Sequence, residues 1–186
     1  GIRILFYGLS GTGKTELARY IAEKLNKKIC LKRVSDIMSP YVGENEHNIA
    51  KAFDEAEASG DVLLFDEADS FFSNREDAVR SWERTLVNEF LTQMEEFNGI
   101  LICTTNLKTI MDPAMQRRFH ILTEFKPLAK SGIEKLLGSF FAAYNFESNQ
   151  TEKLLRYDSV TPGDFGAIAG KIRFMEPSQI SSDMII

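Results

Sequence analysis

The stretch Gly8-Leu9-Ser10-Gly11-Thr12-Gly13-Lys14-Thr15 decides the fold. It fits the phosphate-binding pattern G-x-x-x-x-G-K-[ST] at every fixed position. The apolar run at residues 2–7 comes directly before it and predicts a buried strand, and helical periodicity follows it. A glycine-rich turn that matches by chance would lack this context on both sides. The sequence therefore predicts a site for a nucleoside triphosphate.

The residue types in this stretch suit phosphate chemistry. Glycines let backbone N–H groups turn inward around an anion, where a Cβ would block the approach. Lys14 adds a cation, and the hydroxyl of Thr15 can ligate Mg²⁺ at the start of the next helix. The predicted nucleotide contacts are Gly8, Leu9, Ser10, Gly11, Thr12, Gly13, Lys14, Thr15, Glu16 and Asp66.

Apolar strands alternate with amphipathic helices over residues 1–126. Strands are predicted at residues 2–7, 29–34, 62–65, 100–103 and 120–125, and helices between them. Strands that are apolar throughout indicate a parallel sheet covered on both faces, an α/β core with five strands. Residues 127–186 change character, with helices expected near residues 133–144, 154–157 and 161–172. We expect a small all-helical lid there.

Two carboxylates, Asp66 and Glu67, follow the predicted strand at residues 62–65. The carboxyl ends of parallel strands are where such sheets bind ligands. Asp66 is expected to hold Mg²⁺ with Thr15, and Glu67 to polarise the attacking water as a general base. The alternative is a structural one, in which the acidic residues cap the helix that follows.

Further polar residues follow the fourth predicted strand. Asn106 could contact the γ-phosphate or the lytic water, although taken alone it is more often a turn former. Arg117 and Arg118 precede the fifth strand, and on spacing alone a paired arginine is a solvated surface.

These motifs together resemble the AAA ATPases, the ATPases associated with diverse cellular activities. The resemblance runs from Ile4 to about Phe125 and more loosely beyond. It implies ATP and Mg²⁺ as ligands, ATP hydrolysis, and a P-loop fold. It also implies that Asn106 is a sensor of the γ-phosphate, and that Arg117 or Arg118, with Arg118 favoured, acts in trans in a ring, expected to be a hexamer. Gly163 stands where other branches of the superfamily carry an arginine, which is typical of the protein-remodelling branch.

Tyr41-Val42-Gly43 resembles the aromatic–aliphatic–Gly pore loop of ring-forming unfoldases. An aromatic side chain on a mobile loop can grip an extended polypeptide without sequence preference. The resemblance therefore implies a protein substrate bound through Tyr41 and Val42. In the alternative interpretation Tyr41 packs back onto its own domain.

Composition limits the partners of this chain. The 186 residues carry a formal net charge of −5, which disfavours a large nucleic-acid footprint. No apolar run reaches the roughly 20 residues of a membrane span. Cys30 and Cys103 are expected to be buried free thiols. We expect a cytoplasmic protein, of which this chain is a piece, because it begins at Gly1 and ends on Met184-Ile185-Ile186.

Three other functions stay open at this stage. Asp66-Glu67-Ala68-Asp69 spells the signature of the DEAD-box helicases, but the chain is too short for their second motor domain. An AAA+ module acting on nucleic acid, of the clamp-loader or initiator kind, is disfavoured by the acidic charge. A nucleotide-gated assembly module, which would bind ATP without sustained turnover, is disfavoured by Glu67.

Overall fold

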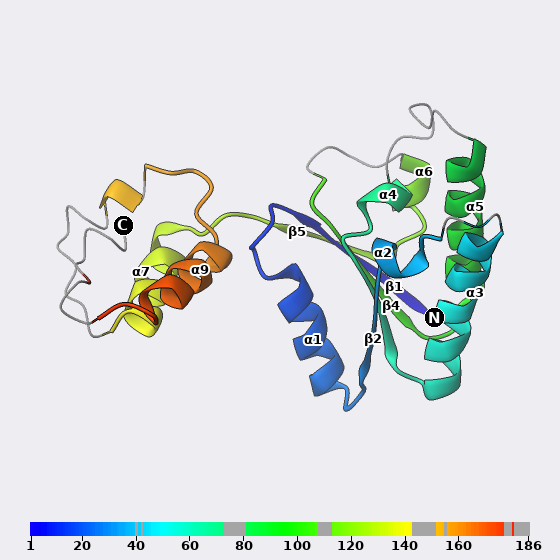
Figure 1. The fold of residues 1–186 in the computed structure, drawn as a ribbon, viewed down its shortest axis with the longest axis horizontal. Coiled ribbons are helices and arrows are strands. Elements are labelled where there is room, and N and C mark those ends of the chain that lie inside the picture. Colours follow the sequence, from blue (N-terminus) through cyan, green and yellow to red (C-terminus); the bar gives the residue numbers. More distant parts are fainter. Residues whose placement is uncertain are drawn as a thin grey trace. The chain divides into compact units, whose positions relative to one another are not determined.

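The computed structural model describes residues 1–39, 41, 43–72, 81–107, 113–142, 152–154, 156–176 and 180. Its elements are shown in Figure 1 and follow one another as β1 Ile2–Gly8, α1 Lys14–Lys24, β2 Ile29–Arg33, α2 Val34–Ile37, α3 Glu44–Ser59, β3 Val62–Asp66, α4 Asp69–Phe72, α5 Ser81–Glu96, β4 Ile100–Thr105, α6 Pro113–Gln116, β5 Ile121–Phe125, α7 Lys130–Phe140 and α9 Pro162–Ile172.

The chain forms two compact units. The first comprises Gly1–Gly8 and Lys14–Glu124, and the second comprises Leu9–Gly13 and Phe125–Ile186. The expected division into a core at residues 1–126 and a lid at residues 127–186 stays a prediction.

The first unit is built on a five-stranded sheet with the order β2-β3-β4-β1-β5. The pairs β2–β3, β3–β4 and β4–β1 are parallel, and Cys103 of β4 lies opposite both Phe65 of β3 and Leu5 of β1. This register brings the carboxyl ends of β3, β4 and β1 to one edge of the sheet. The predicted α/β fold with a five-stranded parallel sheet is confirmed.

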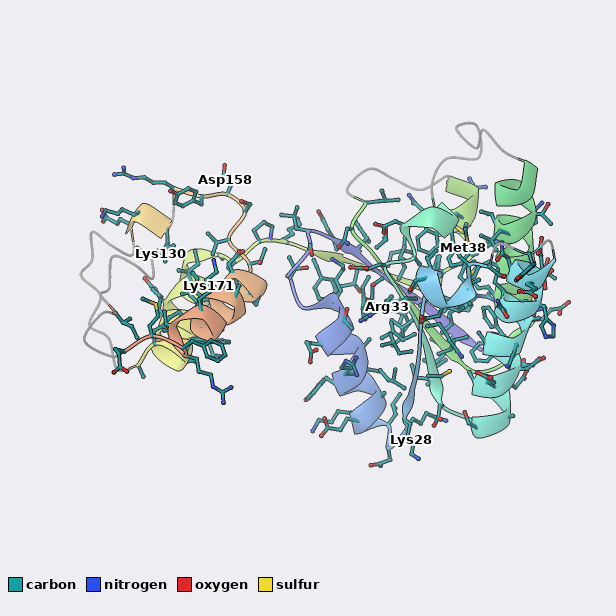
Figure 2. All side chains as sticks on the ribbon, in the orientation of Figure 1. Lys28, Arg33, Met38, Lys130, Asp158 and Lys171 are labelled. Atoms are coloured by element: carbon teal, nitrogen blue, oxygen red, sulfur yellow. The ribbon has the colours of Figure 1, made fainter. Side chains whose placement is uncertain are left out.

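Helices cover both faces of this sheet, with α1 on one side and α3 and α5 on the other (Figure 1). Side chains alternate along the strands, so that Leu5, Phe65 and Cys103 belong to the cluster beneath α3 and α5 while Ile4 and Leu64 do not. Side chains fill the space between the sheet and these helices (Figure 2).

Phenylalanines dominate the core beneath α3 and α5. The ring centroids of Phe71 and Phe90 are 4.5 Å apart in a stacked pair, and Phe65 meets Phe90 edge-on at 5.1 Å. Burying one such side chain contributes roughly 1.5–3 kcal/mol to folding. Phe71 lies in α4, directly after the Asp66-Glu67-Ala68 segment, so its packing anchors the acidic end of β3 to the core.

Helices α7 and α9 pack together in the second unit. Their buried cluster contains Ile133, Leu137, Phe141, Leu154 and Phe165. Helix α9 begins with Pro162 at its first turn, and the Asp164 carboxylate accepts a hydrogen bond from the Thr161 N–H (2.8 Å). This is a reciprocal capping box, and it fixes where the helix begins.

Two residues predicted to lie in strands do not: His120, which precedes β5, and Val34. Val34 was assigned to the second strand because it is apolar and β-branched, but it begins α2. The Asp36 carboxylate accepts a hydrogen bond from the Arg33 N–H (2.8 Å), which favours a helical turn over a further strand residue. Tyr144 and Leu155, which were expected in lid helices, lie outside the described residues.

Both cysteines are free thiols; Cys103 is buried and Cys30 is half-buried. Desolvation raises the pKa of each thiol, most strongly for Cys103.

Within the described ranges, no helix has the length and apolar character that crossing a membrane requires.

Candidate nucleotide-binding and hydrolytic site

The turn that joins β1 to α1 along the chain has the backbone that its glycines predict. Gly8, Gly11 and Gly13 have φ values of 129°, 76° and 96°, a region that side chains with a Cβ rarely adopt. The Thr12 hydroxyl donates to the Leu9 carbonyl (2.7 Å) and closes the turn. Ser10 is exposed. The turn therefore has glycine at each of its three positions with positive φ.

Lys14 begins α1 and is only 6% exposed. Its Nζ donates to the Gly8 carbonyl and to Asn106 Oδ1, each at 2.8 Å. Burial lowers the pKa of Lys14, and the charges of Asp69, Asp66 and Glu67 act in the opposite direction. A buried ammonium surrounded by carboxylates is a local cation that suits a polyphosphate.

Thr15 and Asp66 meet at the carboxyl end of β3. The Thr15 hydroxyl donates to Asp66 Oδ1 (2.8 Å), and Asp66 is 9% exposed. One hydroxyl and one carboxylate fit Mg²⁺, which binds oxygen and completes its shell with water and substrate phosphates. Glu16 is exposed, and its carboxylate lies 3.8 Å from Arg19 on the same helix.

Glu67 follows Asp66 with an unusual backbone. Its φ is +54°, in the left-handed region that residues other than glycine rarely occupy. Its N–H donates to the Thr104 hydroxyl (3.0 Å), and the next N–H, of Ala68, donates to the Thr104 carbonyl (2.8 Å). The Glu67 side chain is exposed. Thr104 of β4 thus holds the backbone of this turn, while the Glu67 carboxylate faces solvent.

Asn106 directly follows β4, and it is held by a carboxylate that the sequence analysis did not assign. Asp69 Oδ1 accepts hydrogen bonds from the Asn106 N–H (3.0 Å) and the Thr105 hydroxyl (2.5 Å). In the sequence, only its place at the end of the Asp66-Glu67-Ala68-Asp69 pattern points to Asp69 as a site residue. Thr104, which contacts both predicted carboxylate residues, gave no signal beyond its place before Asn106.

The two arginines follow α6. The Arg118 guanidinium forms an ion pair with Glu95 of α5 (2.5 Å), and its carbonyl accepts a hydrogen bond from Arg3 Nε (2.8 Å). Arg118 is half-buried, whereas Arg117 is exposed. Asp112 of the same motif lies outside the described residues.

The candidate pore loop precedes α3. Tyr41 is 68% exposed, so the alternative in which it packs onto its own domain is wrong. Gly43 has φ +84° and provides the N-terminal cap of α3. Val42 lies outside the described residues.

A glycine contact lies within the second unit. The Gly163 N–H donates to the Gly11 carbonyl (2.8 Å), and a Cβ added to Gly163 would lie 2.8 Å from Gly11 Cα. Real Cβ atoms do not approach other atoms this closely, so any larger residue at position 163 requires the two segments to separate.

The class is defined by a parallel sheet, a glycine turn leading into a helix, a buried lysine, and a helix hydroxyl that donates to a carboxylate at the end of β3. This is a P-loop nucleoside triphosphatase. The sequence model of the family described as "ATPase family associated with various cellular activities (AAA)" matches residues 4–127. The chain belongs to this family and is an ATPase domain, as the sequence resemblance implied.

One of the relatives matches most of the chain. The chain is 36% identical over 141 residues to "Protein SAV" of Sulfolobus acidocaldarius, covering 72% of this chain and 18% of that protein. It spans less than a fifth of that relative's length.

Solved structures share the fold. A chain of the E. coli MS115-1 HORMA:CdnC:Trip13 complex superposes with a TM-score of 0.76 and 24% identity, over 98% of this chain and 71% of that one. The FIGL-1 AAA domain, crystallised with ADP, gives a TM-score of 0.69 and 22% identity, over 97% and 65% of the two chains.

Proposed function

We propose that this domain binds ATP with Mg²⁺, hydrolyses it, and uses the cycle in a ring to remodel a protein substrate. The observation that carries the proposal is the meeting of Lys14, Thr15, Asp66, Glu67 and Asn106 at the carboxyl ends of β1, β3 and β4. Membership of the AAA family supports ATP as the nucleotide.

The residues would divide the chemistry among them. The glycine turn offers N–H groups to the phosphates, and Lys14 supplies a positive charge. Thr15 and Asp66 would hold Mg²⁺, which neutralises charge on the phosphates when it is bound. Glu67 accepts a proton from water as the water oxygen bonds to the γ-phosphorus and the bond to the ADP oxygen breaks. Asn106 orients water or a γ-phosphate oxygen with a neutral amide.

The arginines supply the argument for a ring. Arg117 is exposed, whereas Arg118 is engaged with Glu95 of its own chain. The resemblance favours Arg118 for the contact with a neighbouring subunit's nucleotide, and Arg118 stays the alternative. We propose Arg117 for that contact because its side chain is exposed, and a supporting position for Arg118. An arginine supplied in trans contributes on the order of 10³–10⁵ in turnover, so a ring would be required for full activity.

Tyr41 supplies the argument for a protein substrate. An exposed tyrosine two residues before a glycine in a left-handed conformation can contact a polypeptide of any sequence. We propose that the loop around Tyr41 and Val42 grips the substrate, and that the ring is a hexamer in the cytoplasm.

ATP turnover per chain, measured across protein concentrations with saturating ATP and Mg²⁺, tests the proposal. We expect the rate per chain to rise as subunits associate, as followed in parallel by light scattering. A rate that stays constant across association would contradict the trans contact. Absence of ATP turnover at every concentration, with the fold intact by circular dichroism, would contradict hydrolysis by this domain.

A further inference from the structure

Thr104 lies at the end of β4 and touches both acidic residues of the neighbouring strand. Its side chain is buried, with 1% of the residue exposed. Its hydroxyl donates to Asp66 Oδ1 (2.6 Å) and accepts the Glu67 N–H (3.0 Å). A threonine hydroxyl has one proton and two lone pairs, so these two bonds assign its proton to Asp66.

The contact with Asp66 fixes the orientation of its carboxylate. The hydroxyls of Thr104 and Thr15 both donate to the same oxygen, Oδ1, from β4 and α1 respectively. Two donors from different elements restrict rotation of the carboxylate about its Cβ–Cγ bond. Charge-assisted hydrogen bonds of this kind are stronger than neutral ones.

The contact with Glu67 supports a strained turn. A left-handed conformation is unfavourable for a residue with a Cβ, and it persists only where the surroundings enforce it. Thr104 provides two acceptors for this turn: its hydroxyl for the Glu67 N–H and its carbonyl for the Ala68 N–H. The carbonyl bond is available to any residue at position 104, whereas the hydroxyl bond requires serine or threonine.

We infer that Thr104 is a positioning residue for ATP hydrolysis, whose hydroxyl orients Asp66 and holds the backbone from which Glu67 reaches the attacking water. This inference rests on the proposed function, because it acts through Glu67. Removing the hydroxyl at constant volume leaves the Glu67 N–H without its side-chain acceptor and Asp66 with one donor fewer.

The test compares Thr104→Val, which keeps the shape, with Thr104→Ser, which keeps the hydroxyl. We expect Thr104→Val to lower kcat about 10- to 100-fold, as losses of supporting hydrogen bonds around a site do. The KM for ATP is expected to change much less, because Lys14 and the glycine turn are intact. Thr104→Ser is expected to retain kcat within about threefold of the parent chain, on the same reasoning.

Thr92→Val is the matched control. Thr92 is exposed on α5 and its hydroxyl donates to the Asn88 carbonyl (3.1 Å), so the same substitution removes a hydroxyl far from the acidic residues. Its kcat is expected to equal that of the parent chain. If Thr104→Val shows no cooperative thermal unfolding transition, Thr104→Cys takes its place. The cysteine thiol is a weak hydrogen-bond donor and acceptor, so we expect the same loss of kcat.

A double-mutant cycle separates this inference from the proposed function. Added to Glu67→Gln, Thr104→Val should lower the residual rate little further, because both changes affect one step. The inference about Thr104 would be overturned if Thr104→Val kept the parental kcat, or if Thr104→Ser lost as much kcat as Thr104→Val. With Glu67→Gln inactive, either outcome would leave the proposed function unaffected. Full turnover in Glu67→Gln would instead overturn the proposed function.

Discussion

The carboxyl ends of β3 and β4 differ sharply from the loop before α3, although both belong to the first unit. At the strand ends, Asp66 and Thr104 are buried and joined by a direct hydrogen bond. In the loop, Tyr41 is mostly exposed, and Gly43, two residues further on, has a positive φ. Hydrogen bonds within the chain fix the side chains at the strand ends, whereas the loop before α3 presents the side chain of Tyr41 to solvent.

This difference separates two kinds of residue. Groups that act on a nucleotide bound to the same chain need positions set before binding, and hydrogen bonds between strands supply that. Groups that act on another molecule need exposure, and Tyr41 and Arg117, which we propose for such contacts, are exposed. Substitutions in the first kind should act within one chain, and those in the second kind only when a partner is present.

Arg117→Ala should produce the largest loss, about 10³–10⁵-fold in turnover per chain in the associated state. Since the contact is expected to be made in trans, dilute chains should lose little. Mixing Arg117→Ala with Glu67→Gln chains should restore turnover, because a Glu67→Gln neighbour still supplies its arginine to an intact Glu67.

Arg118→Ala is the matched variant. Its ion pair with Glu95 lies within the chain, so we expect a smaller loss of turnover that mixing does not restore. A greater loss in Arg118→Ala than in Arg117→Ala, with recovery on mixing, would assign the trans contact to Arg118.

Glu67→Gln should lower turnover by about 10²–10⁴-fold at every protein concentration, because the carboxylate acts on its own chain's nucleotide. ATP binding, measured by titration with a fluorescent ATP analogue, should be retained. Glu23→Gln, which removes an exposed carboxylate from α1, is the control and should be fully active. Unchanged turnover in Glu67→Gln would remove Glu67 from the chemistry.

Gly163→Ala should lower the free energy of unfolding by about 1–3 kcal/mol, because its Cβ would overlap Gly11 Cα. In the same helix, the Cβ added by Gly166→Ala would meet nothing within 4 Å, so this substitution should raise the free energy of unfolding by roughly 0.5–1 kcal/mol. Urea unfolding of the two variants measures the difference. Equal stabilisation in both would show that the Gly11–Gly163 contact is not maintained in solution.

Tyr41→Ala should have the smallest effect on basal turnover, within about twofold, as for exposed surface positions. Stimulation of turnover by casein, an unfolded polypeptide, should be lost. Tyr20→Ala, which removes another exposed tyrosine, should keep the stimulation. If casein stimulates Tyr41→Ala as strongly as the parent chain, Tyr41 does not contact the substrate.

The order of elements could be predicted because their signals are local. Apolar runs marked the five strands, and the residues of the phosphate-binding motif are contiguous. Val34 was misassigned because its β-branched side chain favours a strand, while the Asp36 bond that starts α2 depends on geometry.

The supporting contacts of the site could not be predicted from the sequence. Asp69 meets Asn106 across 37 positions, and Thr104 meets Asp66 across 38. Both contacts depend on the register of β3 against β4, because the acidic residues follow from β3 and their partners from β4. A shift of one residue would turn the side chains of Asp66 and Thr104 to opposite faces of the sheet. The pairing of Arg118 with Glu95 likewise depends on where α5 lies.

The left-handed backbone at Glu67 has an evolutionary consequence. Glycine and asparagine adopt this conformation at lower cost than glutamate, so a mutation to either would relieve backbone strain while removing the carboxylate. With the proposed role of Glu67 in hydrolysis, selection for turnover would act at this position against a gain in stability. In a lineage where binding alone came to suffice, Glu67 would be among the first residues replaced.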